Sequence, residues 1–285
     1  MNLEHIVFSK QLYGAPLEES AVKLAAAGFT GFEITVRSGE NIEPECVADE
    51  LPALAGKLKN TGMNIAMITT QINSPDAPFA EKILRTAASL GIRQYRLGEW
   101  RYEGFGTLRR QRDTVKAQLR DIAAMNRAVG IQGVFQNHSH KFFGAVPADL
   151  DYALGDLPPA DIGVYYDPVH GVVEGGSSGW LMGVDILADR IAALGVKDFY
   201  WFNDKSGYAG ARLHSMRLTK LGTGNVPWED IVQILRQIQF DGPCSFYGSG
   251  RAKNGQGAAM SLDELIQMLA GERRIFIELC NADTE

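Results

Sequence analysis

Short runs rich in β-branched and aromatic residues alternate with longer amphipathic stretches along the whole chain, and this alternation limits the fold more than any other feature. The pattern predicts parallel strands joined by crossover helices. Eight strands are expected, at residues 5–8, 32–36, 64–68, 94–97, 133–136, 162–166, 192–196 and 244–247. Helices are expected between them, at residues 17–27, 46–60, 80–90, 108–129, 228–239 and 262–270.

The length and the glycines of the chain agree with eight such units. Gly28, Gly62, Gly91 and Gly130 each follow a helical stretch and precede a strand, where a left-handed cap is expected. The 285 residues are close to the roughly 250 of a typical eight-stranded barrel. We therefore predict an α/β fold, a single (β/α)8 TIM barrel domain over residues 1–285, and keep a doubly wound open sheet as the alternative.

Charge, cysteine content and motifs exclude several classes of protein. The 28 basic and 34 acidic residues give a net charge of -6, which argues against nucleic acid or an anionic membrane surface as partner. Three widely separated cysteines favour neither a disulfide framework nor a cysteine zinc site. No apolar run reaches the roughly 20 residues of a membrane span, and no signal peptide is evident. We expect a soluble cytoplasmic protein, and the absence of Walker and dinucleotide motifs predicts no nucleotide cofactor.

Polar side chains gather where the predicted strands end, and the active sites of barrels lie at those C-terminal ends. The candidates, in strand order, are Glu33, Arg37, Glu99, Trp100, Gln136, Asn137, His138, Asp167, His170, Lys197, Asp198, Trp201, Tyr247 and Ser249. Their convergence on one rim predicts a polar site there.

Proton transfer is the chemistry these side chains suggest first. The ordinary pKa of histidine, about 6.5, suits His170 for proton transfer near neutral pH. Burial can raise the pKa of a glutamate, so Glu33 and Glu99 are further acid and base candidates. Ion pairing with Arg37, Arg96 or Arg101 is the competing interpretation of both glutamates.

Neighbouring residues on a strand point to opposite faces, so only one of Lys197 and Asp198 is expected to enter the pocket. We favour Lys197, whose ammonium could bind a sugar oxygen or carboxylate. A structural salt bridge is its alternative role. Trp100 and Trp201 are expected to stack on a sugar, and core packing is the alternative for both.

Two long segments follow the last two predicted strands. Residues 198–226 exceed the length of most unstructured loops and could cover a pocket. Residues 248–260 are rich in glycine and carry Arg251 and Lys253, which could meet an anionic substrate group. A flexible surface loop is the alternative interpretation of this second segment.

Several short motifs resemble a known family. They are FQNHS at 135–139, DIGVYYDPVH at 161–170, VKDFYW at 196–201, LGTG at 221–224 and GPCS at 242–245. In their order and spacing, from about residue 20 to 250, they resemble the xylose-isomerase-like barrels of the sugar phosphate isomerase/epimerase superfamily.

The resemblance implies a divalent metal, manganese, magnesium, cobalt or zinc, held by carboxylates and a histidine at the ends of the fifth to eighth strands. Such a metal polarises a carbonyl while a side chain moves a proton between carbons. Three expected ligand positions are substituted, by Gln136, Gly195 and Ser249, and only Asp167 keeps its ligand type. We therefore predict that a divalent metal is weakly bound or absent.

The resemblance also implies the function: a carbohydrate isomerase or epimerase acting by proton transfer next to a carbonyl. The predicted catalytic residues are His170, Glu99 and Lys197, and Asp167 is the predicted metal ligand. The predicted substrate-binding residues are Glu33, Trp100, Gln136, Asn137, His138, Asp198 and Trp201. A keto-sugar lyase or hydratase, and a non-catalytic sugar-binding or partner barrel, are the alternatives. The expected partner is a small carbohydrate, and a homo-oligomer is compatible with the resemblance because many relatives pair.

Overall fold

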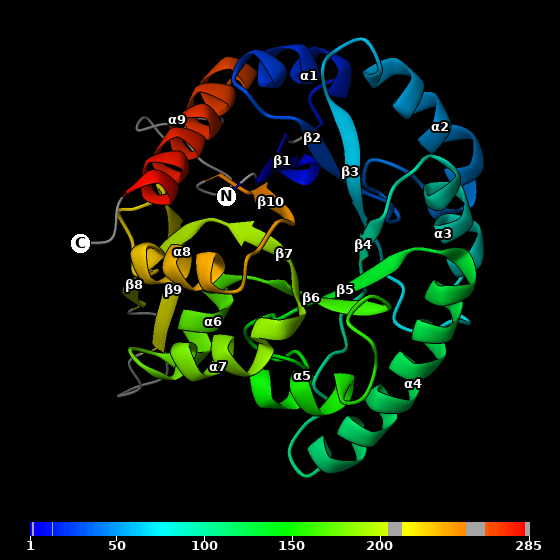
Figure 1. Cartoon of the computed structure of the whole chain (residues 1–285), viewed down its shortest axis with the longest axis vertical. Coiled ribbons are helices and arrows are strands. Elements are labelled where there is room, and N and C mark those ends of the chain that lie inside the picture. Colours follow the sequence, from blue (N-terminus) through cyan, green and yellow to red (C-terminus); the bar gives the residue numbers. More distant parts are fainter. Residues whose placement is uncertain (2, 13, 205–212, 249–259, 283–285) are drawn as a thin grey trace.

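Eight parallel strands form a closed barrel with helices around it in the computed structural model, which describes residues 1, 3–12, 14–204, 213–248 and 260–282 (Figure 1). Around the barrel the strand order is β1-β10-β7-β6-β5-β4-β3-β2. The strands are β1 Glu4–Phe8, β2 Gly31–Thr35, β3 Asn64–Thr69, β4 Gln94–Arg96, β5 Gln132–Gln136, β6 Ile162–Tyr166, β7 Ile191–Val196 and β10 Pro243–Phe246. The predicted α/β barrel is confirmed, and each predicted strand corresponds to one of these eight.

Helices connect the strands on the outside of the barrel. They are α1 Leu17–Ala26, α2 Val47–Leu58, α3 Ala80–Ser89, α4 Leu108–Val129, α5 Pro147–Leu154, α6 Pro168–Gly175, α7 Gly179–Leu187, α8 Trp228–Gln237 and α9 Leu262–Asn281. The four glycines predicted to follow helices all have positive φ angles, between 79° and 88°. No helix in the described part of the chain has the length and apolar character needed to cross a membrane.

The first and last strands of the barrel close it. β1 pairs in parallel with β10, with His5 opposite Cys244, and with β2 on its other side. Apolar side chains fill the space between strands and helices, and a smaller cluster fills the barrel itself. That inner cluster consists of Ile6, Phe8, Met67, Val134, Tyr165, Ala193 and Tyr247. The residues of the candidate site therefore rest on a packed interior.

Two irregularities in strand register lie beside inward-facing side chains. The pairing of β2 with β3 shifts between Phe32 and Glu33, and the pairing of β6 with β7 shifts between Val164 and Tyr165. Such bulges re-aim side chains and are common next to active sites. Glu33 and Tyr165 are hydrogen-bonded to each other inside the barrel, so both shifts help to set one polar network.

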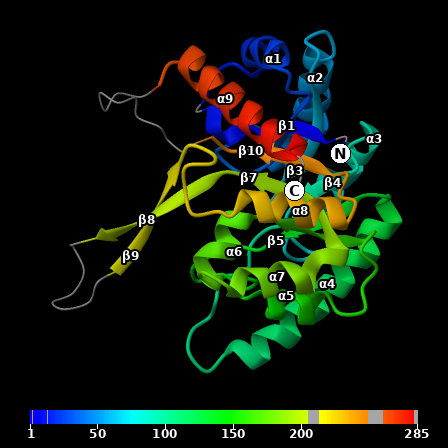
Figure 2. The same cartoon turned by 60° about the vertical axis from the view of Figure 1, so that its left-hand side comes forward.

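The segment after β7 differs from its sequence-based prediction. Much of the predicted loop at residues 198–226 forms an antiparallel pair of strands, β8 Asp198–Asp204 and β9 Leu213–Thr219. This hairpin projects from the body of the barrel (Figure 2). Residues 199–202 are four consecutive aromatic residues, a type enriched in strands, but the expectation of one strand per βα unit concealed this signal.

Candidate active site

Five polar side chains meet at the end of the barrel where the strands end. Glu33 comes from β2, Arg96 from the end of β4 and Gln136 from the end of β5, whereas Asp167 and Lys197 directly follow β6 and β7. All five are at most 6% exposed. Parallel strands of a barrel end on one face, so residues far apart in the sequence come together there.

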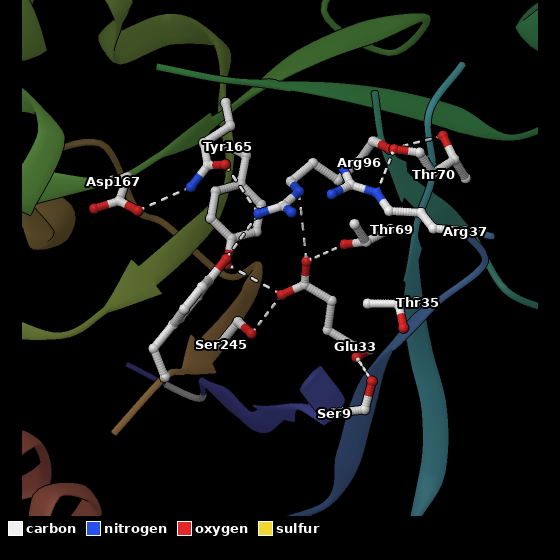
Figure 3. A network of polar contacts seen from close by, with 12 residues as sticks. Ser9, Glu33, Thr35, Arg37, Thr69, Thr70, Arg96, Tyr165, Asp167 and Ser245 are labelled. Atoms are coloured by element: carbon white, nitrogen blue, oxygen red, sulfur yellow. Dashed lines mark hydrogen bonds and ion pairs between the residues drawn. The ribbon is translucent and has the colours of Figure 1, made fainter. Parts of the chain in front are cut away.

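Glu33 is a fully buried carboxylate of this group, at the centre of a polar network (Figure 3). It accepts hydrogen bonds from Thr69 Oγ1, from Ser245 Oγ at 2.6 Å and from Tyr165 OH at 3.2 Å. Arg96 Nε lies 3.8 Å from Glu33 Oε1. Protein groups thus surround both carboxylate oxygens. The negative charge of Glu33 balances the positive charge of Arg96. Substrate contact at Glu33 stays a prediction.

Arg96 connects this inner network to the upper part of the site. Its Nη1 donates to Gln136 Oε1 and to Tyr247 OH, both at 2.9 Å. Its guanidinium carbon lies 5.2 Å from the centre of the Phe8 ring, within cation–π range. Arg96 Nε is buried without a hydrogen-bond partner among the described residues. The guanidinium is therefore a fixed positive charge inside the barrel.

Asp167, Lys197 and His170 form the second group of the site. Lys197 Nζ lies 2.8 Å from Asp167 Oδ2 and 3.1 Å from His170 Nε2. Gln136 Nε2 donates to the same Asp167 oxygen at 2.8 Å. His170 follows Asp167 by one helical turn, because Asp167 caps the N-terminus of α6. A carboxylate, an ammonium and an imidazole thus share one small volume at the barrel mouth.

The contacts of His170 favour one protonation state. A lysine ammonium has hydrogens to donate and no lone pair, so Nε2 accepts from Lys197 and the ring proton lies on Nδ1, which is 2.8 Å from Ser139 Oγ. The ring of His138 stacks on His170 with centroids 4.2 Å apart. Burial, helped by the charge of Lys197, holds the pKa of His170 well below its usual range. His170 is therefore a neutral imidazole at pH 7.

Asn137 positions Asp167 through the backbone. Its Oδ1 accepts from Asp167 N at 2.7 Å, and its Nδ2 donates to Asp167 O at 3.1 Å. This pair of bonds uses both ends of the amide. The predicted substrate contact of Asn137 stays a prediction, and the geometry gives the residue a positioning role. His138, beside it, is partly exposed and faces the site through its stack on His170.

Glu99 lies at the rim and is paired. Arg37 Nη2 is 3.3 Å from Glu99 Oε1, and Arg37 Nε donates to Thr70 O at 2.9 Å. Burial acts to raise the pKa of Glu99, but the positive charges of Arg37 and Arg96 outweigh it and lower that pKa. The expectation of a pKa raised toward neutrality is therefore wrong for Glu99. With its side chain 30% exposed, Glu99 is an ionised carboxylate that a substrate can reach.

Three predicted substrate contacts have other partners or lie apart from the cluster. Trp100 is 7% exposed, packs on Phe135 and donates from Nε1 to Gln118 Oε1 at 2.7 Å, as expected of a core residue. The Asp198 carboxylate accepts four backbone N–H groups, those of Phe199, Gly222, Gly224 and Val226. It therefore anchors the segment that follows β9, whereas Lys197 contacts Asp167 and His170.

Trp201 is the third of these residues and lies on the projecting hairpin, where its ring is edge-to-face with Phe199 at 5.2 Å. It is 38% exposed and stays a predicted sugar contact. Ser249, Arg251 and Lys253 lie outside the described residues.

Sequence reasoning missed several members of the site. Arg96 was considered only as an ion-pair partner, although it is the last residue of β4 and points into the barrel (Figure 3). Tyr247 was a predicted rim residue, but its contacts were not foreseen: it follows β10 and contacts both Arg96 and the Lys197 ammonium, which lies 4.7 Å from its ring centre. Ser139 and Tyr165 were missed as hydrogen-bond partners. To find these residues, strand ends would have to be predicted to within one or two residues. Patterns in a single sequence do not locate strand ends so precisely.

A further cavity lies elsewhere, at the opposite end of the barrel. It has a volume of about 930 Å³ and is lined by residues at the beginnings of strands, among them Glu4, Asn64, Gln94, Gln132 and Pro243. Catalytic groups of TIM barrels lie at the other face. We therefore place the candidate active site at the cluster of Asp167, Lys197, His170 and Gln136.

The donor set at this cluster does not fit a divalent ion. Asp167 is a carboxylate, but its Oδ2 already accepts from Lys197 and Gln136. Gly195 has no donor side chain. Within the described ranges, no three histidine, cysteine, aspartate or glutamate side chains are grouped so that they could hold a metal ion. We therefore derive no chemical step through a metal.

The closed βα barrel, with a buried carboxylate, ammonium and imidazole where its strands end, defines the TIM-barrel class of fold. Residues 22–269 match the family described as xylose isomerase-like TIM barrel, and the chain belongs to that family. This confirms the resemblance drawn from the motifs. No curated protein matches the chain by sequence.

Solved structures of the same fold include several enzymes. The 3-keto-D-glucoside 4-epimerase of E. coli is 13% identical, with a TM-score of 0.65 over 97% of this chain and 99% of that one. The IOLI protein with a bound zinc atom is 12% identical, with a TM-score of 0.74 over 99% and 100%. A probable 3-DHS dehydratase of Bacillus anthracis is 15% identical, with a TM-score of 0.66 over 96% and 99%. At these identities the likeness shows the fold alone.

Proposed function

We propose that this protein is a carbohydrate isomerase or epimerase that transfers a proton at the carbon next to a carbonyl group. The observation that carries the proposal is the contact of the buried Lys197 ammonium with both the Asp167 carboxylate and the His170 imidazole. Membership of a family whose solved folds include sugar epimerases supports the same class of reaction.

The contacts suggest a role for each residue. Lys197 Nζ has three hydrogens, and two are directed to Asp167 and His170. When substrate binds, the hydrogen directed to His170 can turn to a substrate carbonyl oxygen, which frees the lone pair on His170 Nε2. Removing the neighbouring carbon-bound proton moves an electron pair onto that oxygen, where the ammonium stabilises the negative charge. Returning the proton to the other face gives an epimer. Returning it to the former carbonyl carbon, while the proton of the neighbouring hydroxyl moves to the former carbonyl oxygen, gives an isomer.

Two groups of the site can carry the proton. His170 is a neutral imidazole with its Nε2 lone pair directed to Lys197. We assign it as the base, acting when the substrate takes over the lysine hydrogen. Glu99 is the second proton carrier, because it is ionised and open to solvent at the rim. Gln136 and His138 hold the sugar hydroxyl groups, while Asn137 fixes Asp167.

Exchange of carbon-bound hydrogen for deuterium tests this proposal, whichever epimer or isomer the reaction forms. The protein is incubated in heavy water with a panel of ketoses and keto-glycosides, and deuterium entry at carbon is followed by NMR. His170→Ala and Glu99→Gln are each expected to lower the exchange rate by about 10²–10⁴-fold. Glu103→Gln, at an exposed loop position, serves as the matched control with unchanged exchange.

The same spectra distinguish the other outcomes. A new vinyl proton would identify elimination, and hence a lyase or hydratase, in place of isomerisation. Binding of a sugar without any deuterium entry would refute the enzyme assignment and support a non-catalytic sugar-binding barrel. Exchange that survives in both folded variants would assign the proton transfer to other residues.

A further inference from the structure

Two side chains that could ligate a metal are directed at the same nitrogen atom, that of the Lys197 ammonium. Asp167 Oδ2 is 2.8 Å from it and His170 Nε2 is 3.1 Å from it. A carboxylate oxygen and an imidazole nitrogen are common ligands of zinc and manganese. The ring of Tyr247 lies against the same ammonium, 4.7 Å from ring centre to Nζ. The charged end of Lys197 thus occupies the point at which those two ligands converge.

Gln136 reinforces this arrangement from the neighbouring strand. Its carbonyl oxygen accepts from Arg96 Nη1 at 2.9 Å, so its amide nitrogen faces Asp167 and donates to Oδ2 at 2.8 Å. An amide held in this orientation presents hydrogens to the centre of the cluster. The buried guanidinium of Arg96 therefore prevents Gln136 from acting as an oxygen ligand there.

Gly195, on β7, leaves room for the Asp167 carboxylate. A β-carbon at this position would lie 3.1 Å from Asp167 Oδ2 and 3.2 Å from its Cγ, closer than side chains normally approach. Any larger residue at Gly195 would press on the carboxylate, which would have to shift by a few tenths of an ångström. The absence of a side chain at Gly195 and the presence of the ion pair are therefore linked.

We infer that Lys197 is a built-in cation that takes the place of the divalent ion, so that this barrel excludes metal and binds an α-hydroxycarbonyl substrate through the ammonium itself. A divalent ion at Asp167 would face the positive charge of Lys197 at hydrogen-bonding distance and would have to displace it. The substrate class rests on the proposed function, whereas metal exclusion rests on the contacts alone. In the reaction the proton leaves carbon for the base and the electron pair moves to the carbonyl oxygen beside Nζ, without any further reactant.

Titration with manganese tests the exclusion directly. The chelator-treated protein is titrated with Mn²⁺, and free ion is measured by electron paramagnetic resonance. Lys59→Met, which removes an exposed positive charge, is the control. The wild type and Lys197→Arg are expected to have an Mn²⁺ affinity no higher than that of this control. The double variant Lys197→Met with Gln136→Glu removes the ammonium and adds a carboxylate, so its affinity should rise at least about tenfold over the wild type.

Each result of the titration supports or overturns the inference. Stoichiometric, tight binding by the wild type that Asp167→Asn abolishes would overturn it. So would a double variant that folds by circular dichroism and binds no more tightly than the wild type. If that variant does not fold, Lys197→Gln replaces it, because an amide at 197 can still donate to Asp167 without carrying charge; unchanged binding there also counts against the inference.

Deuterium exchange separates this inference from the proposed function. Exchange at equal rates in chelator and in Mn²⁺ is expected. Exchange that requires added Mn²⁺ would refute the built-in cation and leave the isomerase assignment standing. A protein that excludes Mn²⁺ and exchanges no substrate proton would refute the isomerase assignment and leave the built-in cation standing.

Discussion

His5, on β1, links the stability of the barrel to pH. Its ring is 8% exposed and packs edge-to-face on Phe246 and Phe276, at 5.6 and 5.8 Å. Burial, with a smaller effect of the Arg273 charge, lowers the pKa of His5 to about 4. In the unfolded chain this pKa returns to about 6.5. The folded state therefore binds fewer protons than the unfolded state between these two values.

This difference predicts an acid-sensitive free energy of unfolding. The stability that depends on neutral His5 is fully present above pH 6.5 and is lost as the pH falls toward 4. His5 alone should lower the free energy of unfolding by about 2 kcal/mol between pH 7.5 and pH 5. Guanidinium denaturation at the two pH values measures it. In His5→Phe, which keeps an aromatic ring at this position, the free energy of unfolding should fall by about 2 kcal/mol less than in the wild type over the same pH change. An equal fall in both proteins would refute the assignment to His5.

At the scale of single residues, the sequence indicated much of the candidate site but not how its members are connected. Strand ends and family motifs placed Gln136, Asp167, His170 and Lys197 on one rim, and the structure brings these four together. They did not reveal that Lys197 lies between Asp167 and His170. That arrangement depends on side-chain rotamers and on Tyr247, which a pattern of residue types does not encode.

Two glycines in or beside helices make opposite predictions about stability. Gly56 lies within α2, where an added β-carbon would meet no atom within 4 Å. Gly130 ends α4 with a φ of 80°, also in open space. Gly56→Ala should stabilise the protein by about 0.5–1 kcal/mol, because alanine restricts the unfolded chain.

Gly130→Ala should instead destabilise it by about 1–2 kcal/mol, because the left-handed conformation strains an L-residue. Thermal unfolding of the two variants beside the wild type measures both effects. Shifts of the same sign would contradict the argument from backbone conformation.

At the scale of elements, strands and long helices followed from periodicity and glycine placement. α6 was not predicted, because PVHGVVEG at residues 168–175 has two glycines and three β-branched residues. Its formation depends on Asp167, whose side chain accepts from His170 N, and on Pro168 at the first turn. The hairpin of β8 and β9 was missed for a different reason, since its pairing joins residues that the barrel repeat does not require.

For the whole molecule, closure of the barrel predicts cooperative unfolding. β1 is held between β2 and β10, so the beginning of the chain completes its pairing only when the last strand is in place. Ion pairs such as Lys23 with Asp263 join α1 to α9 as well. We expect a single calorimetric transition that coincides with loss of the near- and far-ultraviolet circular dichroism. Two separated transitions would show that the predicted single domain over residues 1–285 is wrong.

The mutual contacts of Asp167, Gln136, Lys197 and Gly195 also restrict how this barrel can change during evolution. Loss of Lys197 alone leaves a buried carboxylate without its cation. Glutamate at 136 alone sets two carboxylates against each other, and histidine at 195 alone presses on Asp167. Each single step toward a metal-binding set is therefore disfavoured while the other residues are unchanged. A change to a metal-binding site therefore requires several of these residues to be substituted together.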